Sequence, residues 1–118
     1  METLVKIGIR DYGTNPGPFN FPWCAAWLNR VLDEAGIKHA DSLMARSYLQ
    51  KGAETTTPKL GDIVVLWRVE KAGPWGHVGL FIAEDNTNVW LLGGNQDNEV
   101  NITRYPKYRV LGYRTFNA

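Results

Sequence analysis

Apolar residues recur through residues 22–35 at the spacing of an α-helix. Positions three and four apart share a helix face, so one face collects Cys24, Trp27, Leu28, Val31, Leu32 and Ala35. Gly36 follows directly, where a glycine commonly ends a helix. At the other end Pro22 suits the first turn and Asn20 is a suitable N-cap. The pattern predicts a helix from near Pro22 to Ala35.

The segments on either side of this helix carry weaker patterns. Residues 1–19 are interrupted by Gly13, Pro16, Gly17 and Pro18, and we expect a strand fragment or arm followed by a loop. A second, shorter helix is predicted from residue 41 or 42 to residue 52. Residues 53–61 contain Thr, Pro and Gly and are predicted to form a loop.

After residue 61 the pattern changes to short apolar runs of β-forming residues. The run 63–67 is continuous, which is consistent with a buried strand. Polar turn residues at 85–88 separate two further strands, at 77–82 and 89–92, and two more are predicted near 100–104 and 109–113. Helices followed by an antiparallel meander of about five strands predict an α+β fold. The 118 residues contain no repeat or linker, so we expect a single domain spanning residues 1–118.

The composition excludes several classes of function. Hydrophobic residues make up 44% of the chain and charged residues 21%, which is ordinary for a globular domain. The net charge of +1 provides no electrostatic footprint for nucleic acid. No apolar run approaches the ~20 residues needed to cross a bilayer, so we expect no membrane insertion. One cysteine excludes an internal disulfide, and with two histidines it makes a poor ligand set for a metal.

Cys24 lies in the first turn of the predicted helix. Unpaired backbone N–H groups and the helix dipole favour negative charge there, and helix N-termini lower the pKa of thiols. Because the thiolate is the reactive form of cysteine, the position suits a nucleophile. The alternative is that Cys24 packs as a small apolar residue, as free cysteines commonly do.

His77 begins a predicted strand and has glycines at 76 and 79. Glycine allows a ligand or a second backbone to approach closely, and imidazole exchanges protons near neutral pH. The alternative is a histidine at a strand edge that bonds to solvent or to a backbone carbonyl.

A side-chain amide is predicted to lie beside His77 on the next strand. If residue 83 pairs with residue 89, His77 faces Asn95, whereas a register shifted by one places Gln96 there instead. A Cys–His pair needs a third group to fix the ring tautomer, and an amide supplies it in cysteine hydrolases. We expect Asn95 to be this group, with Gln96 as the alternative. By composition alone, residues 93–98 also fit a plain polar loop.

Three sequence segments, considered together, support a catalytic role for Cys24 and His77 more strongly than either residue does alone. They are Pro22-Trp23-Cys24-Ala25-Ala26-Trp27, then Pro58-Lys59-Leu60-Gly61-Asp62-Ile63-Val64, and then Gly76-His77-Val78-Gly79. In this order they resemble the NlpC-like and CHAP superfamily (cysteine, histidine-dependent amidohydrolase/peptidase), over about residues 21–113. The stretch from residue 93 to residue 114 is similar to a subgroup of short bacterial and phage proteins.

The resemblance implies a papain-like cysteine peptidase or amidase that cuts an amide or peptide bond of peptidoglycan through a thioester. It implies Cys24 as the nucleophile and His77 as the base, with the third catalytic position expected at Asn95. It implies no cofactor.

Further residues are expected to bind the substrate. Backbone N–H groups at the helix start should hold the oxyanion, and the Asn20 side chain is a candidate second donor. Trp23 and Trp75 lie within two residues of the proposed catalytic groups and are expected to wall the cleft, with core packing as the alternative. Gln96 is also expected to contact substrate if Asn95 is the third catalytic residue.

The N-terminus lacks a basic segment followed by a long apolar stretch, so we expect no standard secretory signal. We expect synthesis in the cytoplasm and action on the cell wall or periplasm after release by a phage holin or a secretion machine. The expected partners are a peptidoglycan peptide and, for an antibacterial effector, an immunity or inhibitor protein. Two alternatives remain: a catalytically silent wall-binding or adaptor module, and another papain-like acyl-transfer enzyme.

Overall fold

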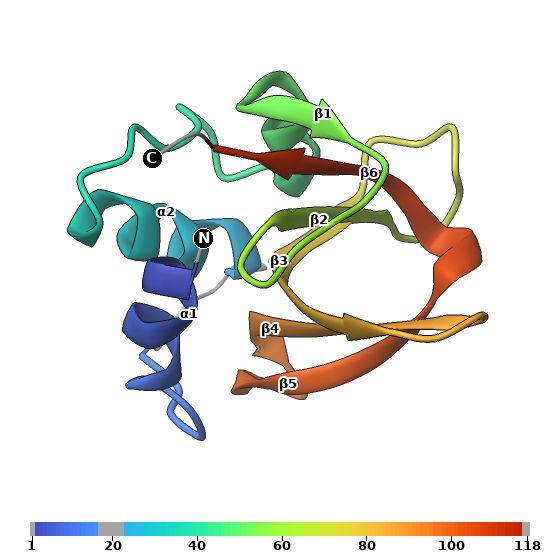
Figure 1. Cartoon of the computed structure of the whole chain (residues 1–118). Coiled ribbons are helices and arrows are strands. Elements are labelled where there is room, and N and C mark those ends of the chain that lie inside the picture. Colours follow the sequence, from blue (N-terminus) through green and yellow to red (C-terminus); the bar gives the residue numbers. More distant parts are fainter. Residues whose placement is uncertain (1, 17–22, 117–118) are drawn as a thin grey trace.

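The computed structural model describes residues 2–16 and 23–116, and these form helices packed on one antiparallel sheet. Figure 1 shows α1 and α2 next to each other on one side of a strongly curved sheet. The α+β class expected from the sequence is confirmed. In chain order the elements are α1 (Glu2–Ile9), α2 (Cys24–Glu34), the 3-10 helix η1 (Ala45–Gln50), β1 (Ala53–Thr55), β2 (Ile63–Trp67), β3 (Gly76–Glu84), β4 (Asn88–Gln96), β5 (Glu99–Pro106), the 3-10 helix η2 (Lys107–Arg109) and β6 (Val110–Thr115).

The strand order is β1-β6-β2-β3-β4-β5. Strands β2 to β5 form the expected meander, and β6 then returns to pair with β2. The sheet therefore has six strands among the described residues rather than about five. The additional strand is β1, which lies in the segment 53–61 predicted to be a loop. Its three residues form a strand because β6, far along the chain, provides their partners, as in the pair Glu54↔Arg114.

The helix α2 agrees with its apolar pattern, whereas the second predicted helix differs from expectation. Gly36 follows α2 with φ +74°, and its backbone N–H donates to the carbonyl of Asp33, as expected at a helix end. The proposed start at Pro22 and cap at Asn20 lie outside the described residues. The segment predicted as a helix from residue 41 or 42 is a short 3-10 helix over residues 45–50.

The expectation of a strand fragment or arm at the N-terminus was wrong, because residues 2–9 form α1. Leu4 and Gly8 are its buried positions, and they lie one helical turn apart. A Cβ atom on Gly8 would lie 3.0 Å from the Trp27 ring, so the helix packs closely on α2 at this point. Tertiary packing outweighs the weak local signal of this short segment.

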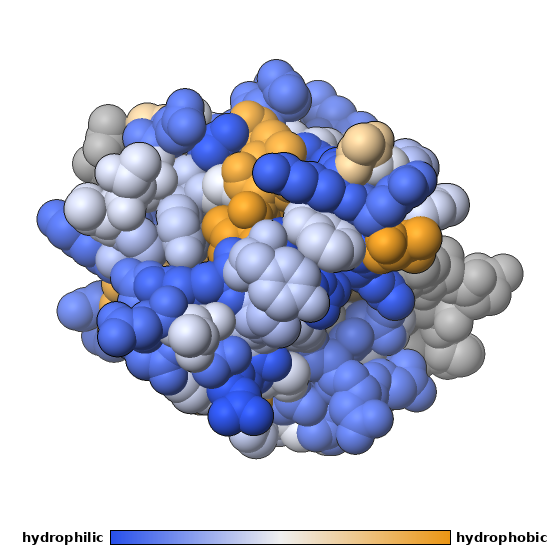
Figure 2. Space-filling model, turned by 90° about the vertical axis from the view of Figure 1, so that its right-hand side faces the viewer, coloured by the Kyte–Doolittle hydropathy of each residue, from blue (hydrophilic) through white to orange (hydrophobic). Residues whose placement is uncertain are grey.

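The sheet is apolar on both faces. Along β2, Ile63 and Val65 face the helices, whereas Val64 and Leu66 contribute to a second apolar cluster on the opposite face. This explains the continuous apolar run, since the first four residues of β2 are buried and only Trp67 is partly exposed. On the side of the molecule away from α1 and α2, Figure 2 shows a mostly hydrophilic surface with an apolar band near its upper centre.

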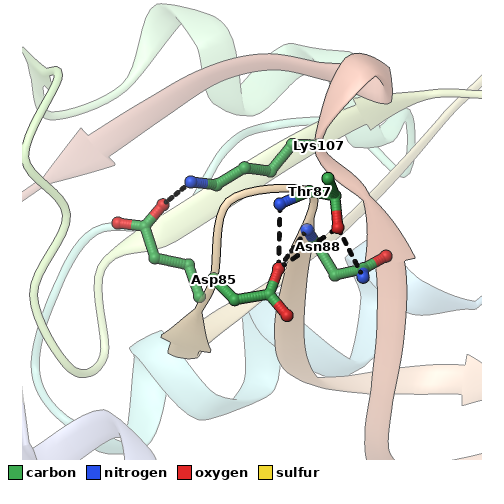
Figure 3. Close-up of polar contacts among 5 residues, drawn as sticks. Asp85, Thr87, Asn88 and Lys107 are labelled. Atoms are coloured by element: carbon green, nitrogen blue, oxygen red, sulfur yellow. Dashed lines mark hydrogen bonds and ion pairs between the residues drawn. The ribbon is translucent and has the colours of Figure 1, made fainter.

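The hairpin between β3 and β4 joins the strands that carry His77 and Gln96. Oδ1 of Asp85 accepts hydrogen bonds from the backbone N–H groups of Thr87 at 2.9 Å and of Asn88 at 2.7 Å (Figure 3). Lys107 adds an ion pair with Glu84 at 2.6 Å. These contacts fix the turn and therefore the register of the two strands.

Near the turn, the pairing of β3 with β4 differs by one residue from the register considered in the sequence analysis. Ala83 pairs with Trp90 rather than with Val89, and an irregularity between residues 81 and 83 shifts the pairing by one. Beyond this irregularity Leu80 pairs with Leu92.

Candidate active site

Cys24 is the first residue of α2 and lies between the core and an open cleft. Its side chain is only 3% exposed and belongs to the apolar cluster under the helices. It also lines a cleft of about 500 Å³, so apolar packing and access to a ligand coexist at this residue.

Burial raises the pKa of the Cys24 thiol above its usual range. Hydrogen bonds from the backbone of Val78 and Ala25 and the charge of Arg68 act in the opposite direction without reversing it. The low thiol pKa expected from a helix start is therefore not found, because desolvation of the thiolate outweighs the backbone donors. In the resting protein Cys24 is a neutral thiol.

The Cys24 sulfur lies next to the strand that carries His77. One of the backbone groups that hydrogen-bond to this sulfur belongs to Val78, the residue that follows His77 in β3. A negative charge on Cys24 would raise the pKa of Tyr105, and the hydroxyl oxygen of Tyr105 lies 3.2 Å from Nε2 of His77. The fold therefore brings two residues that are 53 positions apart in the chain to one site.

His77 is buried, and its ring is oriented by an amide. Nε2 of His77 lies 2.9 Å from Oε1 of Gln96. The Gln96 amide nitrogen donates to the carbonyl of Leu91 and to both the backbone and the side-chain oxygens of Asn101. This leaves the Gln96 oxygen as the acceptor toward the imidazole, so Nε2 carries the hydrogen. Nδ1 is then the basic nitrogen.

Gly93 makes the room that this hydrogen bond requires. A Cβ atom at this position would lie 2.5 Å from Oε1 of Gln96 and 3.4 Å from Nε2 of His77. The glycines flanking His77 allow a close approach of neighbouring strands, as expected. Cβ atoms on Gly76 and Gly79 would lie 2.8 Å and 3.1 Å from the carbonyl oxygens of Leu66 and Leu92.

Asn95, which the sequence predicts as the group beside His77, does not hydrogen-bond to the ring, and Gln96 does so instead. Asn95 lines a smaller cavity of about 280 Å³ beside the imidazole. Its backbone is left-handed, with φ +56°, and the pairing of β4 with β5 shifts between Gly93 and Gln96. This irregularity turns the Gln96 side chain toward the ring, which is the alternative that the sequence left open.

The buried ring is neutral at physiological pH. Burial, with smaller contributions from the charges of Arg68 and Arg109, lowers the pKa of His77 to about 4, and the hydrogen bond with Gln96 opposes this shift without cancelling it. A neutral imidazole beside a neutral thiol is suited to take a proton when the sulfur attacks.

Three further residues at the site were missed from the sequence: Arg68, Tyr105 and Arg109. They line the smaller cavity with His77. No local pattern marks them, since Arg68 follows a strand as many exposed arginines do and the other two come from the far end of the sheet. Only the pairing of β4 with β5 and the return of the chain through η2 bring Tyr105 and Arg109 to His77.

The residues expected to bind substrate have different environments. Trp75 is 54% exposed and lines the larger cleft, together with Leu43, Met44 and Val69. Trp23 is buried in the core, where its ring packs against the backbone at Gly94, so packing is its observed role. Asn20 lies outside the described residues.

The described residues contain neither a cluster of metal-binding side chains nor a helix that could span a membrane. No group of three or more His, Cys, Asp or Glu side chains in residues 2–16 and 23–116 is arranged to hold a metal ion. Among the same residues, no helix has the length and apolar character needed to cross a membrane.

A helix-start cysteine beside a strand histidine that an amide orients is an arrangement that cysteine-dependent hydrolases use. The family model described as CHAP domain matches residues 16–95, and the chain belongs to this family, as the sequence motifs predicted. CHAP domains are in general amidases and peptidases that act on peptidoglycan. No curated protein is similar enough to the chain to count as a match.

Proposed function

We propose that the chain is a cysteine peptidase or amidase that cleaves an amide bond in the peptide part of peptidoglycan. Cys24 is the nucleophile, His77 is the base and Gln96 is the positioning residue that holds the ring. The observation that carries the proposal is the hydrogen bond from His77 to Gln96. It leaves Nδ1 as the basic nitrogen of the histidine whose neighbour in β3, Val78, hydrogen-bonds to Cys24. The general activity of the CHAP family supports the substrate class.

In the first half of the reaction, Cys24 Sγ attacks the carbonyl carbon of the scissile amide while its proton passes to Nδ1 of His77. The oxyanion forms near the backbone N–H groups at the start of α2, including that of Cys24. Gln96 accepts the Nε2 hydrogen of the imidazolium and stabilises it. The C–N bond then breaks, the imidazolium proton moves to the leaving amine, and a thioester remains.

In the second half, a water molecule attacks the thioester carbon and His77 accepts a proton from it. The C–S bond breaks, the acid product leaves, and the proton returns to the Cys24 sulfur. Each proton that His77 accepts is released again, so the enzyme returns to its starting state without a cofactor.

The test is to incubate purified peptidoglycan with the wild-type protein, Cys24→Ala and Cys24→Ser, and to identify the released fragments by mass. We expect fragments from the wild type only, with both variants retaining the wild-type circular dichroism spectrum. A new amino terminus on the first L-alanine, which is joined to muramic acid, would identify an amidase, and one at any later residue of the peptide a peptidase. Hydrolysis by folded Cys24→Ala would contradict the proposal, and wall binding without any hydrolysis would favour a silent binding module.

A further inference from the structure

Two guanidinium groups border the cavity beside His77. Arg68 follows β2 and Arg109 ends η2, and both side chains line the cavity of about 280 Å³ with Thr103 and Tyr105. Both guanidinium charges act electrostatically on the imidazole, since each lowers the pKa of His77. Neither arginine is required by the mechanism proposed above.

Arg109 is held in place by its surroundings. Its Nε donates to the carbonyl oxygen of Trp67 at 3.1 Å. Its guanidinium carbon lies 5.9 Å from the centre of the Trp67 ring and 5.5 Å from that of Tyr105. With Nε used and the plane fixed by two rings, the terminal nitrogens are the donors that remain for a ligand.

Arg68 lies where the two cavities meet. It lines both the cleft that contains Cys24 and the smaller cavity that contains His77. Its guanidinium has no hydrogen bond or ion pair with the residues that the structure describes. A ligand extending from Cys24 past His77 therefore passes this charge.

The smaller cavity has an excess of positive charge. Asp97 is the one carboxylate among its described lining residues, against two arginines, and His77 is neutral at pH 7. The larger cleft differs, because Arg68 is the one charged residue among the described residues that line it, beside Leu43, Met44, Val69 and Trp75. The site is thus apolar on one side of Cys24 and cationic on the other.

We propose that Arg68 and Arg109 form an anion subsite that binds a carboxylate of the peptide substrate on the His77 side of the scissile bond. This rests on the proposed function and adds a specificity to it. Guanidinium groups pair with carboxylates through two parallel hydrogen bonds, and peptidoglycan stem peptides carry free carboxylates along their length. A substrate with a carboxamide in that place forfeits the ionic hydrogen bonds.

The first test uses N-acetylmuramoyl-L-Ala-γ-D-Glu-L-Lys-D-Ala-D-Ala and the same compound with both carboxylates converted to carboxamides. We expect wild-type kcat/KM to be about tenfold or more higher for the carboxylate form. Arg68→Gln and Arg109→Gln should each reduce this ratio toward one by slowing the carboxylate form alone. Arg104→Gln, at an exposed position of β5 and outside the described lining of both cavities, is the matched control and should keep the wild-type ratio.

Equal turnover of the two compounds by the wild type, or a ratio that both cavity variants leave unchanged, would overturn the anion subsite while leaving the hydrolase proposal intact. A second measurement covers the case in which neither compound is cleaved. Calorimetric titration of Cys24→Ala with each compound should then show tighter binding of the carboxylate form, and Arg68→Gln in the same background should remove the difference. Equal binding of both forms would overturn the subsite independently of turnover.

Discussion

The side-chain oxygen of Gln96 accepts the Nε2 hydrogen of His77 at 2.9 Å, and both side chains are buried. Two strands and a backbone irregularity are needed to bring these groups together. The relationship also depends on Gly93, whose missing side chain leaves space for the Gln96 amide. The orientation of the imidazole therefore depends on the sheet as well as on the two residues.

The substitution Gly93→Ala should displace the Gln96 amide and leave the ring misoriented. Because the added Cβ would lie 2.5 Å from the Gln96 oxygen, we expect kcat to fall by about 10²-fold. The measurement is steady-state hydrolysis together with the melting temperature. Gln96→Ala should cause a similar loss, and the double variant should be little worse than either single one. Gly79→Ala, a milder change in the same sheet, is the control, and equal losses in it and in Gly93→Ala would contradict the argument.

The pH dependence of activity should follow the neutral form of His77. With the pKa of His77 lowered to about 4, the imidazole accepts a proton at all pH values well above 4, so kcat/KM should fall about tenfold per pH unit only below about pH 4. The measurement is hydrolysis from pH 3 upward, restricted to conditions in which the fold persists. An acid limb centred above pH 6 would show that the base is not this buried ring.

Alkylation of Cys24 by iodoacetamide tests the resting state of the pair. Since burial raises the pKa of the thiol, we expect slow alkylation at neutral pH and a rate that rises with pH into the alkaline range. A preformed thiolate–imidazolium pair would instead give fast alkylation with a plateau across neutral pH. Such a plateau would contradict the neutral pair described above.

His77 should also make the fold sensitive to acid. Between about pH 6.5 and 4 the unfolded chain binds a proton at this histidine and the folded protein does not, so the free energy of unfolding falls as the pH falls. The loss amounts to about 3 kcal/mol by pH 4, for a shift of about 2.5 pKa units. Urea unfolding at several pH values should show this slope in the wild type and a smaller one in His77→Gln. Equal slopes would place the imidazole in a more solvated environment than the structure indicates.

Arg46 should stabilise the wall of the larger cleft. Its guanidinium donates to the backbone carbonyls of Trp75, Lys71 and Glu70, which ties the loop before β3 to η1. In Arg46→Ala we expect a higher KM and faster amide hydrogen exchange in residues 69–75, with a loss of stability of about 1–3 kcal/mol. Arg30→Ala, an exposed change on α2, should alter neither property. Unchanged exchange in the loop would show that other contacts hold the wall.

Patterns that depend on neighbouring residues agree closely with the structure. The continuous apolar run predicted β2 at Ile63–Trp67, and the helical spacing with Gly36 predicted the body and end of α2. These elements are determined by the spacing of apolar residues and by the residues that form turns, and both effects act over a few neighbouring residues. The α1 helix and β1 were missed because packing on Trp27 and pairing with β6 form them, and both partners are distant in the chain.

The same division holds within the site. The sequence by itself singled out Cys24 at a helix start and His77 between glycines, because the residue types and their immediate neighbours carry that chemistry. Only the tertiary structure decided that Gln96 rather than Asn95 hydrogen-bonds to the ring, that burial keeps Cys24 and His77 neutral, and that Arg68 and Arg109 line the same cavity. Each of these depends on strand register, desolvation or long-range charge, which exist only after the chain has folded.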